Sequence, residues 1–368
     1  MDETSEKTDE QQGFQQADFE KLSQIVSSKF LVEEALLEHN VPTYYLKQPQ
    51  ETKRPFLELL KILDSLNLIA ILRRHGNRIV LRIIPKPQTK PSNVIVNWVL
   101  FFATIGTTFF TGYLLSENIT DPIIGGAAFT IAIMAILGLH EMGHKLTANK
   151  EGIEATPPYF IPGPPPVGNF LGIGTFGAVI MQKSLPHNKD SLFDVGASGP
   201  IFSFILALVA MVIGLMFSPI HKITGTESFL PSPLIFDLYA IFFIKLPSDY
   251  CILLHPVAFA GWVGMIVTML NLMPAGMLDG GHVARSIFGE GARVILTVLS
   301  ILLLVIEGFW PMAFFVLFMS TYRHPGPLDD VSSLSTGRKI FAVVLVVIFV
   351  LSSFVHHLVL GLIELLTG

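Results

Sequence analysis

The chain has 368 residues, of which 51% are hydrophobic and only 14% are charged, and its mean hydropathy is +0.58. Soluble domains contain about 25% charged residues, so this composition indicates a membrane protein with several apolar spans. The net charge of −5 gives no sign of a nucleic-acid partner, and the single cysteine, Cys251, excludes both an intramolecular disulfide and a cysteine-based zinc site.

The N-terminal quarter differs from the apolar remainder. Residues 1–16 are acidic and rich in Gln, without the basic start of a signal peptide, and predict a disordered tail. Residues 17–92 predict a small soluble α+β domain. Its expected elements are a helical segment from Phe19 to His39, a strand at Pro42–Leu46, an amphipathic helix at Pro55–Leu66, and a β-hairpin with strands at 68–72 and 78–84. Alternating prolines and lysines at 85–91 predict an extended linker.

Residues 93–368 predict an α-helical transmembrane domain of six or seven helices. The candidate spans are Val94–Leu115, Pro122–Thr147, Val195–Phe217, Leu254–Met273, Val294–Ile306, Pro311–Met319 and Ile340–Leu360. The stretch 294–319 is too long for one comfortable crossing and short for two, although Glu307-Gly308 offers a break. The number of spans therefore stays open at this point.

Lys and Arg are unequally divided between the loops on the two sides of the predicted spans. If the N-terminal domain is cytoplasmic, the loops on its side carry Lys145, Lys150, Lys183, Lys189, Arg285, Arg293, Arg323, Arg338 and Lys339, against Lys222 and Lys245 on the other side. An excess of Lys and Arg is typical of cytoplasmic loops. The sequence thus predicts a multi-pass protein of the cell membrane with its N-terminal domain in the cytoplasm.

The sequence His140-Glu141-Met142-Gly143-His144 follows the apolar run Pro122–Leu139. On a helix, His140 and His144 lie on one face, one turn apart, and can supply two ligands of a tetrahedral Zn²⁺ site. Glu141 lies beside them as a base for a metal-bound water. Ionisable side chains within a membrane segment are costly and usually mark function. His140 lies about 27 Å of helix rise from Pro122, which predicts a shallow site that is reached from the cytoplasm.

A second motif supplies a third ligand. Pro and Gly residues between Asn271 and His282 break the helix that would otherwise continue from the preceding span. Irregular backbone at membrane depth is tolerated only inside the protein or beside a watery cavity. Asp279 in this break is a reasonable third ligand, and His282 could support it. Two histidines and one carboxylate leave the fourth zinc position for water, which is the catalytic arrangement.

Together, the His-Glu-x-x-His motif and the Asn271…Leu278-Asp279-Gly280 motif resemble the site-2 protease family of intramembrane zinc metalloproteases. The small-Gly-Pro start of the next span, Ala197–Pro200, is also similar to that family, and the resemblance covers about residues 94–290. The Pro-rich loop and the Gly168-Asn169 pair lean toward its archaeal, cyanobacterial and plastid branch. The resemblance implies that His140, His144 and Asp279 bind Zn²⁺, that Glu141 activates water, and that Asn271 holds or polarises the scissile carbonyl.

The segment Gly168–Ile180 is apolar, rich in glycine and too broken for a helix. It predicts a strand or hairpin at the membrane interface. In the resembling family such a sheet receives the unwound substrate, which implies substrate contacts at Asn169, Gly172 and Gly174. The alternative is a surface loop without substrate contact.

These observations predict an intramembrane zinc endopeptidase that acts in regulated intramembrane proteolysis. Its expected partners are the lipid bilayer and a single-span membrane substrate such as a membrane-tethered regulator; its oligomeric state stays open. A zinc transporter or a proteolytically silent membrane scaffold is the alternative. Transporters usually repeat their ligand sets across internal repeats, and no such repeat occurs here. A silent relative would be expected to have lost Glu141, which is present.

Overall fold

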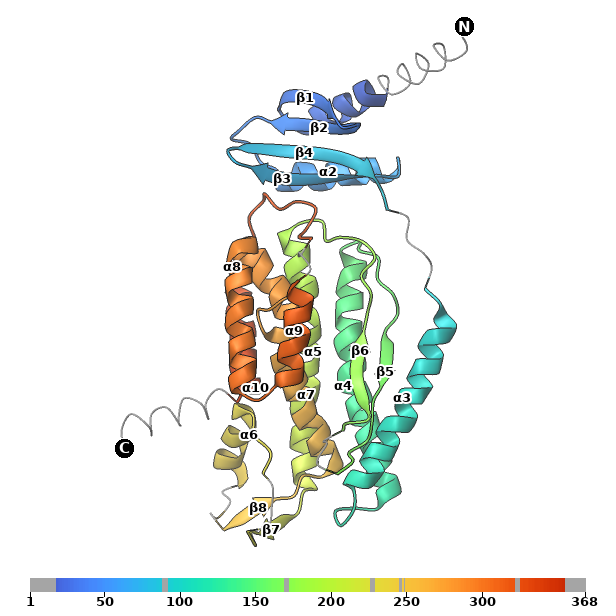
Figure 1. Ribbon diagram of the computed structural model, residues 1–368, viewed down its shortest axis with the longest axis vertical. Coiled ribbons are helices and arrows are strands. Elements are labelled where there is room, and N and C mark those ends of the chain that lie inside the picture. Colours follow the sequence, from blue (N-terminus) through green and yellow to red (C-terminus); the bar gives the residue numbers. More distant parts are fainter. Residues whose placement is uncertain are drawn as a thin grey trace, which may run out of the picture. The chain divides into compact units, whose positions relative to one another are not determined.

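The computed structural model describes residues 18–87, 92–168, 172–225, 229–244, 247, 249–321 and 325–354. The chain forms two compact units (Figure 1). The first joins the N-terminal residues up to the linker with two later segments, Leu185–Ser191 and Pro325–Leu334. The second contains the apolar helices. The proposed tail 1–16 and most of the proposed linker lie outside the described residues.

The first unit is built on a four-stranded antiparallel sheet in the order β1-β2-β4-β3. The elements are a helix over residues 18–27, β1 (Val32–Glu38), β2 (Val41–Leu46), α2 (Lys53–Asp64), β3 (Leu68–His75) and β4 (Arg78–Pro85). The strand at 42–46, the helix at 55–66 and the 68–84 hairpin are as predicted. The hairpin turns at Gly76-Asn77, where Gly76 has a φ of +59°.

The predicted helical segment from Phe19 to His39 is wrong in its second half. The helix ends near residue 27, and residues 32–38 form β1, which pairs with β2. His39 and Asn40 have positive φ values of 51° and 64°, which form a two-residue turn of the type that joins twisted antiparallel strands. Sequence periodicity suggested a helix, but this turn and the cross-strand pairing decide the structure.

The first unit is completed by chain segments that lie far from residues 17–92 in sequence. Leu72 on β3 donates its N–H to the carbonyl of Leu328 at 2.9 Å, and Arg73 donates to the same carbonyl at 2.7 Å. The Leu328 side chain is only 4% exposed and belongs to the same hydrophobic cluster as Phe56 and Leu59. Asp329 continues the pairing as a bridge to both Leu72 and Asn188. This unit is therefore larger than the 17–92 range that composition suggested.

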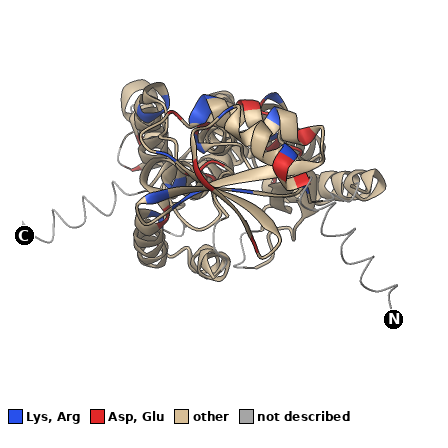
Figure 2. Cartoon of the chain, turned by 90° about the horizontal axis from the view of Figure 1, so that it is seen from above, with Lys and Arg blue, Asp and Glu red and all other residues tan. Residues whose placement is uncertain are grey.

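The second unit is mainly helical. Its elements are α3 (Val94–Leu115), α4 (Pro122–Lys150), β5 (Tyr159–Pro162), β6 (Thr175–Val179), α5 (Lys189–Met216), β7 (Ile220–Lys222), α6 (Leu234–Tyr239), η1 (Ala240–Ile244), β8 (Tyr250–Ile252), α7 (Pro256–Leu272), α8 (Asp279–Ile306), α9 (Trp310–Ser320) and α10 (Thr336–Ser352). Among the described residues, α3, α4, α5 and α8 are long and apolar enough to cross a membrane. The long helices carry few charges and are mostly tan in Figure 2. The chain is a helical membrane protein.

Close packing of α4, α5 and α7 fixes the helix that carries the two histidines. Ile133 and Ile136 of α4 are buried in a cluster with Ala207 of α5 and Met265 of α7. A Cβ at Gly264 would lie 2.7 Å from the Cβ of Ala207, so glycine is required for this approach. Small residues at helix contacts allow the van der Waals packing that holds helices together in lipid, where the hydrophobic effect gives little help.

Helix α8 ends where the span Val294–Ile306 was predicted to end, but it starts earlier than predicted. The predicted break at Glu307-Gly308 is present, because α8 ends at Ile306 and α9 begins at Trp310. However, α8 begins as early as Asp279 and bends at Gly289, whose φ of 83° and ψ of −173° are not helical. Arg285 and Arg293, which were counted as loop charges, are instead buried within α8, at 6% and 3% exposure.

The burial of Leu328 predicts that the stability of the first unit depends on the late segment Pro325–Leu334. Removing a buried leucine side chain costs about 2–5 kcal/mol, and an unpaired buried carboxylate costs more. Leu328→Asp should therefore speed amide hydrogen exchange in β3 and β4 in the full-length protein. Ser333→Asp, at an exposed position of the same segment, is the control and should exchange like wild type. Equal protection in both variants would show that the late segment does not support this sheet.

Candidate active site

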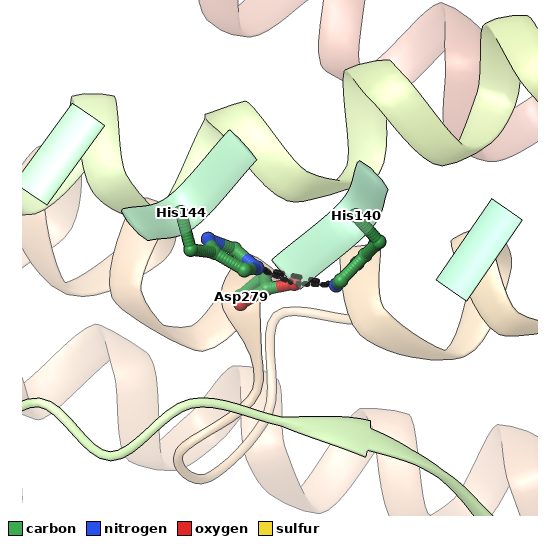
Figure 3. Close-up of side chains that lie close together, drawn as sticks. All are labelled: His140, His144 and Asp279. Carbon is green, nitrogen blue, oxygen red and sulfur yellow. Dashed lines mark hydrogen bonds and ion pairs between the residues drawn. The ribbon is translucent and has the colours of Figure 1, made fainter. Parts of the chain in front are cut away.

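His140, His144 and Asp279 converge on one point (Figure 3). The histidines lie one turn apart on α4, and Asp279 is the first residue of α8. The Asp279 Oδ2 atom is 3.2 Å from Nε2 of each histidine, and the two Nε2 atoms are 3.1 Å apart. In a tetrahedral site with zinc–ligand distances of about 2.0–2.2 Å, donor atoms lie about 3.3–3.6 Å apart, slightly farther than the separations here. The three donors are thus spaced nearly as Zn²⁺ requires.

The chemistry of these donors also fits a metal. Both imidazoles are almost fully buried, at 4% and 6% exposure. Within the described residues, the buried Oδ2 atom of Asp279 has no hydrogen-bond donor. A buried carboxylate oxygen without a donor is costly, and a cation bound between it and the imidazole nitrogens removes that cost. Two histidines and one carboxylate are a ligand set of catalytic zinc sites.

Neighbouring groups orient the two imidazole rings. His144 Nδ1 is 2.7 Å from the carbonyl oxygen of Val195, and His140 Nδ1 is 3.2 Å from Ser203 Oγ. Ser203 Oγ lies in turn 2.9 Å from Thr268 Oγ1, and both residues are fully buried. The Val195 carbonyl can only accept, so it fixes a proton on His144 Nδ1; with a proton on His140 Nδ1 toward Ser203, both Nε2 atoms are free for a metal. Sequence reasoning missed Val195, Ser203 and Thr268, because nothing in the sequence brings α5 and α7 to these rings.

The small residues at the start of α5 make room for His144. A Cβ at Gly199 would lie 2.2 Å from His144 Nε2, and a Cβ at Gly196 would lie 2.9 Å from the carbonyl oxygen of Asp279. The motif Ala197–Pro200 therefore has a steric basis. It lets α5 approach the metal ligands closely enough for the Val195 carbonyl to reach His144.

Glu141 is hydrogen-bonded to the backbone at the end of β6. Its Oε2 accepts a hydrogen bond from the Ile180 N–H at 2.9 Å, and its Oε1 lies 4.0 Å from His140 Nε2. The side chain is 9% exposed. One carboxylate oxygen is thus anchored by backbone, while the other is directed toward the three ligands. Sequence analysis proposed Glu141 as the base but gave no partner for it.

The ligands open into a cleft of ≈440 Å³. Besides the ligands, Glu141 and His282, its lining includes Ala178, Val179 and Ile180 at the end of β6, Asn271 of α7, Gly276, Met277 and Leu278 before α8, and Phe315, Val316 and Met319 of α9. Asn271 faces the metal site, with its Nδ2 atom 3.5 Å from His140 Nε2. The walls are mainly apolar, and the polar groups gather at the ligands.

The glycines predicted to contact substrate lie in close contact with backbone, and their role in substrate binding stays a prediction. Neither Gly172 nor Gly174 is among the residues that line the cleft. A Cβ at Gly172 would lie 2.3 Å from the carbonyl oxygen of Pro165, and one at Gly174 would lie 2.6 Å from that of Thr107. Gly174 also has a φ of +75°. Asn169 lies outside the described residues. The cleft lining on this side begins at Ala178.

The comparison with protein families agrees with this geometry. Residues 128–306 match the model of peptidase family M50, and they contain the metal ligands, Glu141 and Asn271. This part of the chain belongs to family M50, the site-2 protease family. The assignment made from the two sequence motifs is confirmed.

Several plant proteins that are named as probable zinc metalloproteases or metallopeptidases are similar to the chain. The probable zinc metalloprotease EGY2, chloroplastic, of Arabidopsis thaliana is 33% identical over 52% of this chain and 34% of its own length. EGY1 of the same plant is 25% identical over 76% of this chain and 57% of its own length, and EGY3 is 30% identical over 57% and 39%. The chain thus spans about a third to just over half of these relatives. No solved structure matches it.

The ligand geometry predicts which substitutions remove metal. His140→Ala and Asp279→Ala each delete one of three protein ligands and should lower the zinc content of purified protein well below one per chain, measured by elemental analysis. His221→Ala removes an exposed histidine outside the site and should leave the content at the wild-type level. Full zinc occupancy in both ligand variants would contradict the assigned ligand set.

Proposed function

We propose that the protein is an intramembrane zinc endopeptidase that hydrolyses peptide bonds within or next to transmembrane segments of other proteins. One observation carries the proposal: a His₂Asp donor set with an adjacent carboxylate opens into an apolar cleft between apolar helices. The M50 match and the relatives that are named as zinc metalloproteases support the same chemistry.

Each residue of the site has a role in peptide hydrolysis. Zinc held by His140, His144 and Asp279 would lower the pKa of a water molecule toward about 7 and polarise the substrate carbonyl. Glu141 takes the proton of the attacking water on the carboxylate oxygen directed toward the ligands and returns it to the leaving amine. The Ile180 N–H holds the other oxygen in place. Asn271 donates from Nδ2 to the substrate carbonyl.

The substrate is proposed to bind as an extended strand beside β6. A peptide bond in an intact helix is shielded by its own hydrogen bonds, so the segment must unwind before it is cut. Among the described strands, β6 pairs only with β5, and its last residues line the cleft. Strand addition satisfies the backbone groups that unwinding frees. The apolar walls suit a transmembrane segment, such as that of a single-span, membrane-tethered regulator.

We propose that the first unit lies on the cytoplasmic side of the cell membrane, as the excess of Lys and Arg in the loops on its side predicts. Because 185–191 and 325–334 belong to one compact unit, the chain between them crosses the membrane an even number of times. If α5 and the shorter α7, which has 17 residues, each cross once, α8 and α9 together contribute none or two crossings. The 11 residues of α9 rise about 16 Å, roughly half of the hydrocarbon thickness. We favour a hairpin of α8 and α9 that returns to the cytoplasmic side.

Glu141→Gln tests the proposed function. The amide keeps the size of the side chain but removes the base. The variant should keep one zinc per chain and lose cleavage of a single-span model substrate in detergent by at least about 10²–10⁴-fold. Glu117→Gln, the same change at an exposed turn, should behave like wild type.

Three results would contradict the proposal in whole or in part. Unreduced cleavage by Glu141→Gln would remove Glu141 from the mechanism. Zinc flux into vesicles by the wild-type protein, without cleavage of any membrane substrate, would establish the transporter alternative; zinc binding with neither activity would favour a scaffold.

Cysteine labelling tests the topology. In a Cys251→Ser background, single cysteines at Glu20, Ser333 and Leu230 should divide into two groups in sealed vesicles. The cysteines at 20 and 333 should react with an impermeant maleimide from one face and the cysteine at 230 from the other. Labelling of positions 20 and 333 from opposite faces would contradict the even number of crossings.

A further inference from the structure

The loop between α7 and α8 determines where Asp279 lies. Helix α7 ends at Leu272 and α8 begins at Asp279, so six residues carry the chain from one wall of the cleft to the third metal ligand. Within this loop, Gly276 has a φ of +52°, a conformation that favours glycine. Some backbone groups of the loop are bonded locally, such as the Leu278 N–H to the Ala275 carbonyl at 3.1 Å, whereas those of Gly276 have partners outside the loop.

Both polar groups of Gly276 are bound by the distal half of α8. Its N–H donates to Thr297 Oγ1 at 3.1 Å, and its carbonyl oxygen accepts from an Arg293 guanidinium nitrogen, also at 3.1 Å. Thr297 is available as an acceptor because its own hydroxyl proton is donated to the Arg293 carbonyl at 2.8 Å. Thr297 and Arg293 are 4% and 3% exposed. A single residue of the loop is therefore held from two sides by buried donors and acceptors.

A charge cluster fixes Arg293 in turn. Its guanidinium donates twice to Glu290, at 2.6 and 3.0 Å, and Arg285 Nε lies 3.1 Å from the same carboxylate. Arg285 precedes the bend at Gly289, whereas Glu290 and Arg293 follow it. The contacts therefore close a ring that runs from Gly276 through the first turns of α8, across the bend, and back to Gly276. Asp279 lies within this ring.

We propose that Arg293 and Thr297 are positioning residues of the metal site. By holding both polar groups of Gly276, they set the path of the loop and keep the Asp279 carboxylate between His140 and His144. Neither side chain touches the three ligand atoms or lines the cleft. The inference rests on the proposed zinc site. It adds two residues to the groups that position the ligands, and these lie 14 and 18 residues after Asp279 in sequence.

Thr297→Val gives the sharpest test, because valine has nearly the shape of threonine but offers no acceptor to Gly276. Zinc affinity, measured by competition with a chelator, should fall about 10–100-fold, as is usual when a group that orients a metal ligand is removed. Thr297→Ser keeps the hydroxyl and should restore the affinity to within about threefold of wild type.

Thr130→Val is the matched control. Like Thr297, Thr130 is a buried helical threonine whose hydroxyl donates to the carbonyl four residues earlier, at 2.9 Å. If the hydroxyl of Thr297 only stabilises its own helix, both valine variants should lower the melting temperature equally and leave zinc affinity unchanged. That result would overturn the proposal.

Arg293→Lys and Arg293→Gln provide an independent measurement. Lysine keeps the charge beside Glu290 and one donor for the Gly276 carbonyl, so it should retain more zinc affinity than glutamine. In active protein, kcat should fall with little change in KM, because Arg293 does not line the cleft. Equal zinc affinity in wild type, Arg293→Gln and Thr297→Val would contradict the proposal.

The zinc measurements separate this inference from the proposed function. Wild-type protein that binds zinc but cuts no membrane substrate would refute the protease proposal alone, and the affinities of the variants would still decide the role of Arg293 and Thr297. Wild-type protein that binds no zinc would refute both.

Discussion

Backbone groups that leave a helix inside an apolar bundle need partners within the protein, because hydrocarbon offers none. Two non-helical segments, the end of β6 and the loop between α7 and α8, meet at the metal site. At the first, the Ile180 N–H beyond β6 is satisfied by Glu141. At the second, Gly276 is satisfied by Arg293 and Thr297. In both places the group that satisfies the backbone also fixes a part of the catalytic apparatus, so irregular structure and chemistry depend on the same hydrogen bonds.

The orientation of the imidazole rings also depends on contacts with other helices. His140 and His144 come from regular helix, and their spacing alone sets them on one face. Their orientation comes from other helices, through Ser203 of α5 and the carbonyl of Val195. The glycines of α5 permit this approach, since a side chain at Gly199 would occupy the space of the His144 ring. The geometry of the metal ligands therefore depends on how closely α5 packs against α4.

The sequence predicted those site residues whose role can be recognised from a short stretch of neighbouring residues. The i, i+4 histidines and the break around Asp279 identify three ligands, because helical spacing and helix-breaking residues can be recognised within a short window. Ser203, Thr268, Arg293 and Thr297 could not be found in this way. They are ordinary residues of apolar helices, and only tertiary packing brings them to the site.

Two further predictions differ from the structure. The 19–39 segment has helical periodicity, yet the turn at His39-Asn40 and the pairing with β2 make residues 32–38 a strand. Arg285 and Arg293 counted as loop charges in the topology argument, yet both are buried around Glu290. In the first case pairing with β2 selected a strand, and in the second case ion pairs with Glu290 within α8 accompany burial of both arginines.

The composition of the first unit has a consequence for biosynthesis. Arg73 and Leu328 are hydrogen-bonded across 255 positions of sequence, and the residues between them contain most of the apolar helices. At about 5–20 residues per second, a ribosome needs roughly 13–50 s to make that interval. During this time the sheet lacks the Leu328 side chain, so the core of the first unit closes only after the chain has been translated beyond α9.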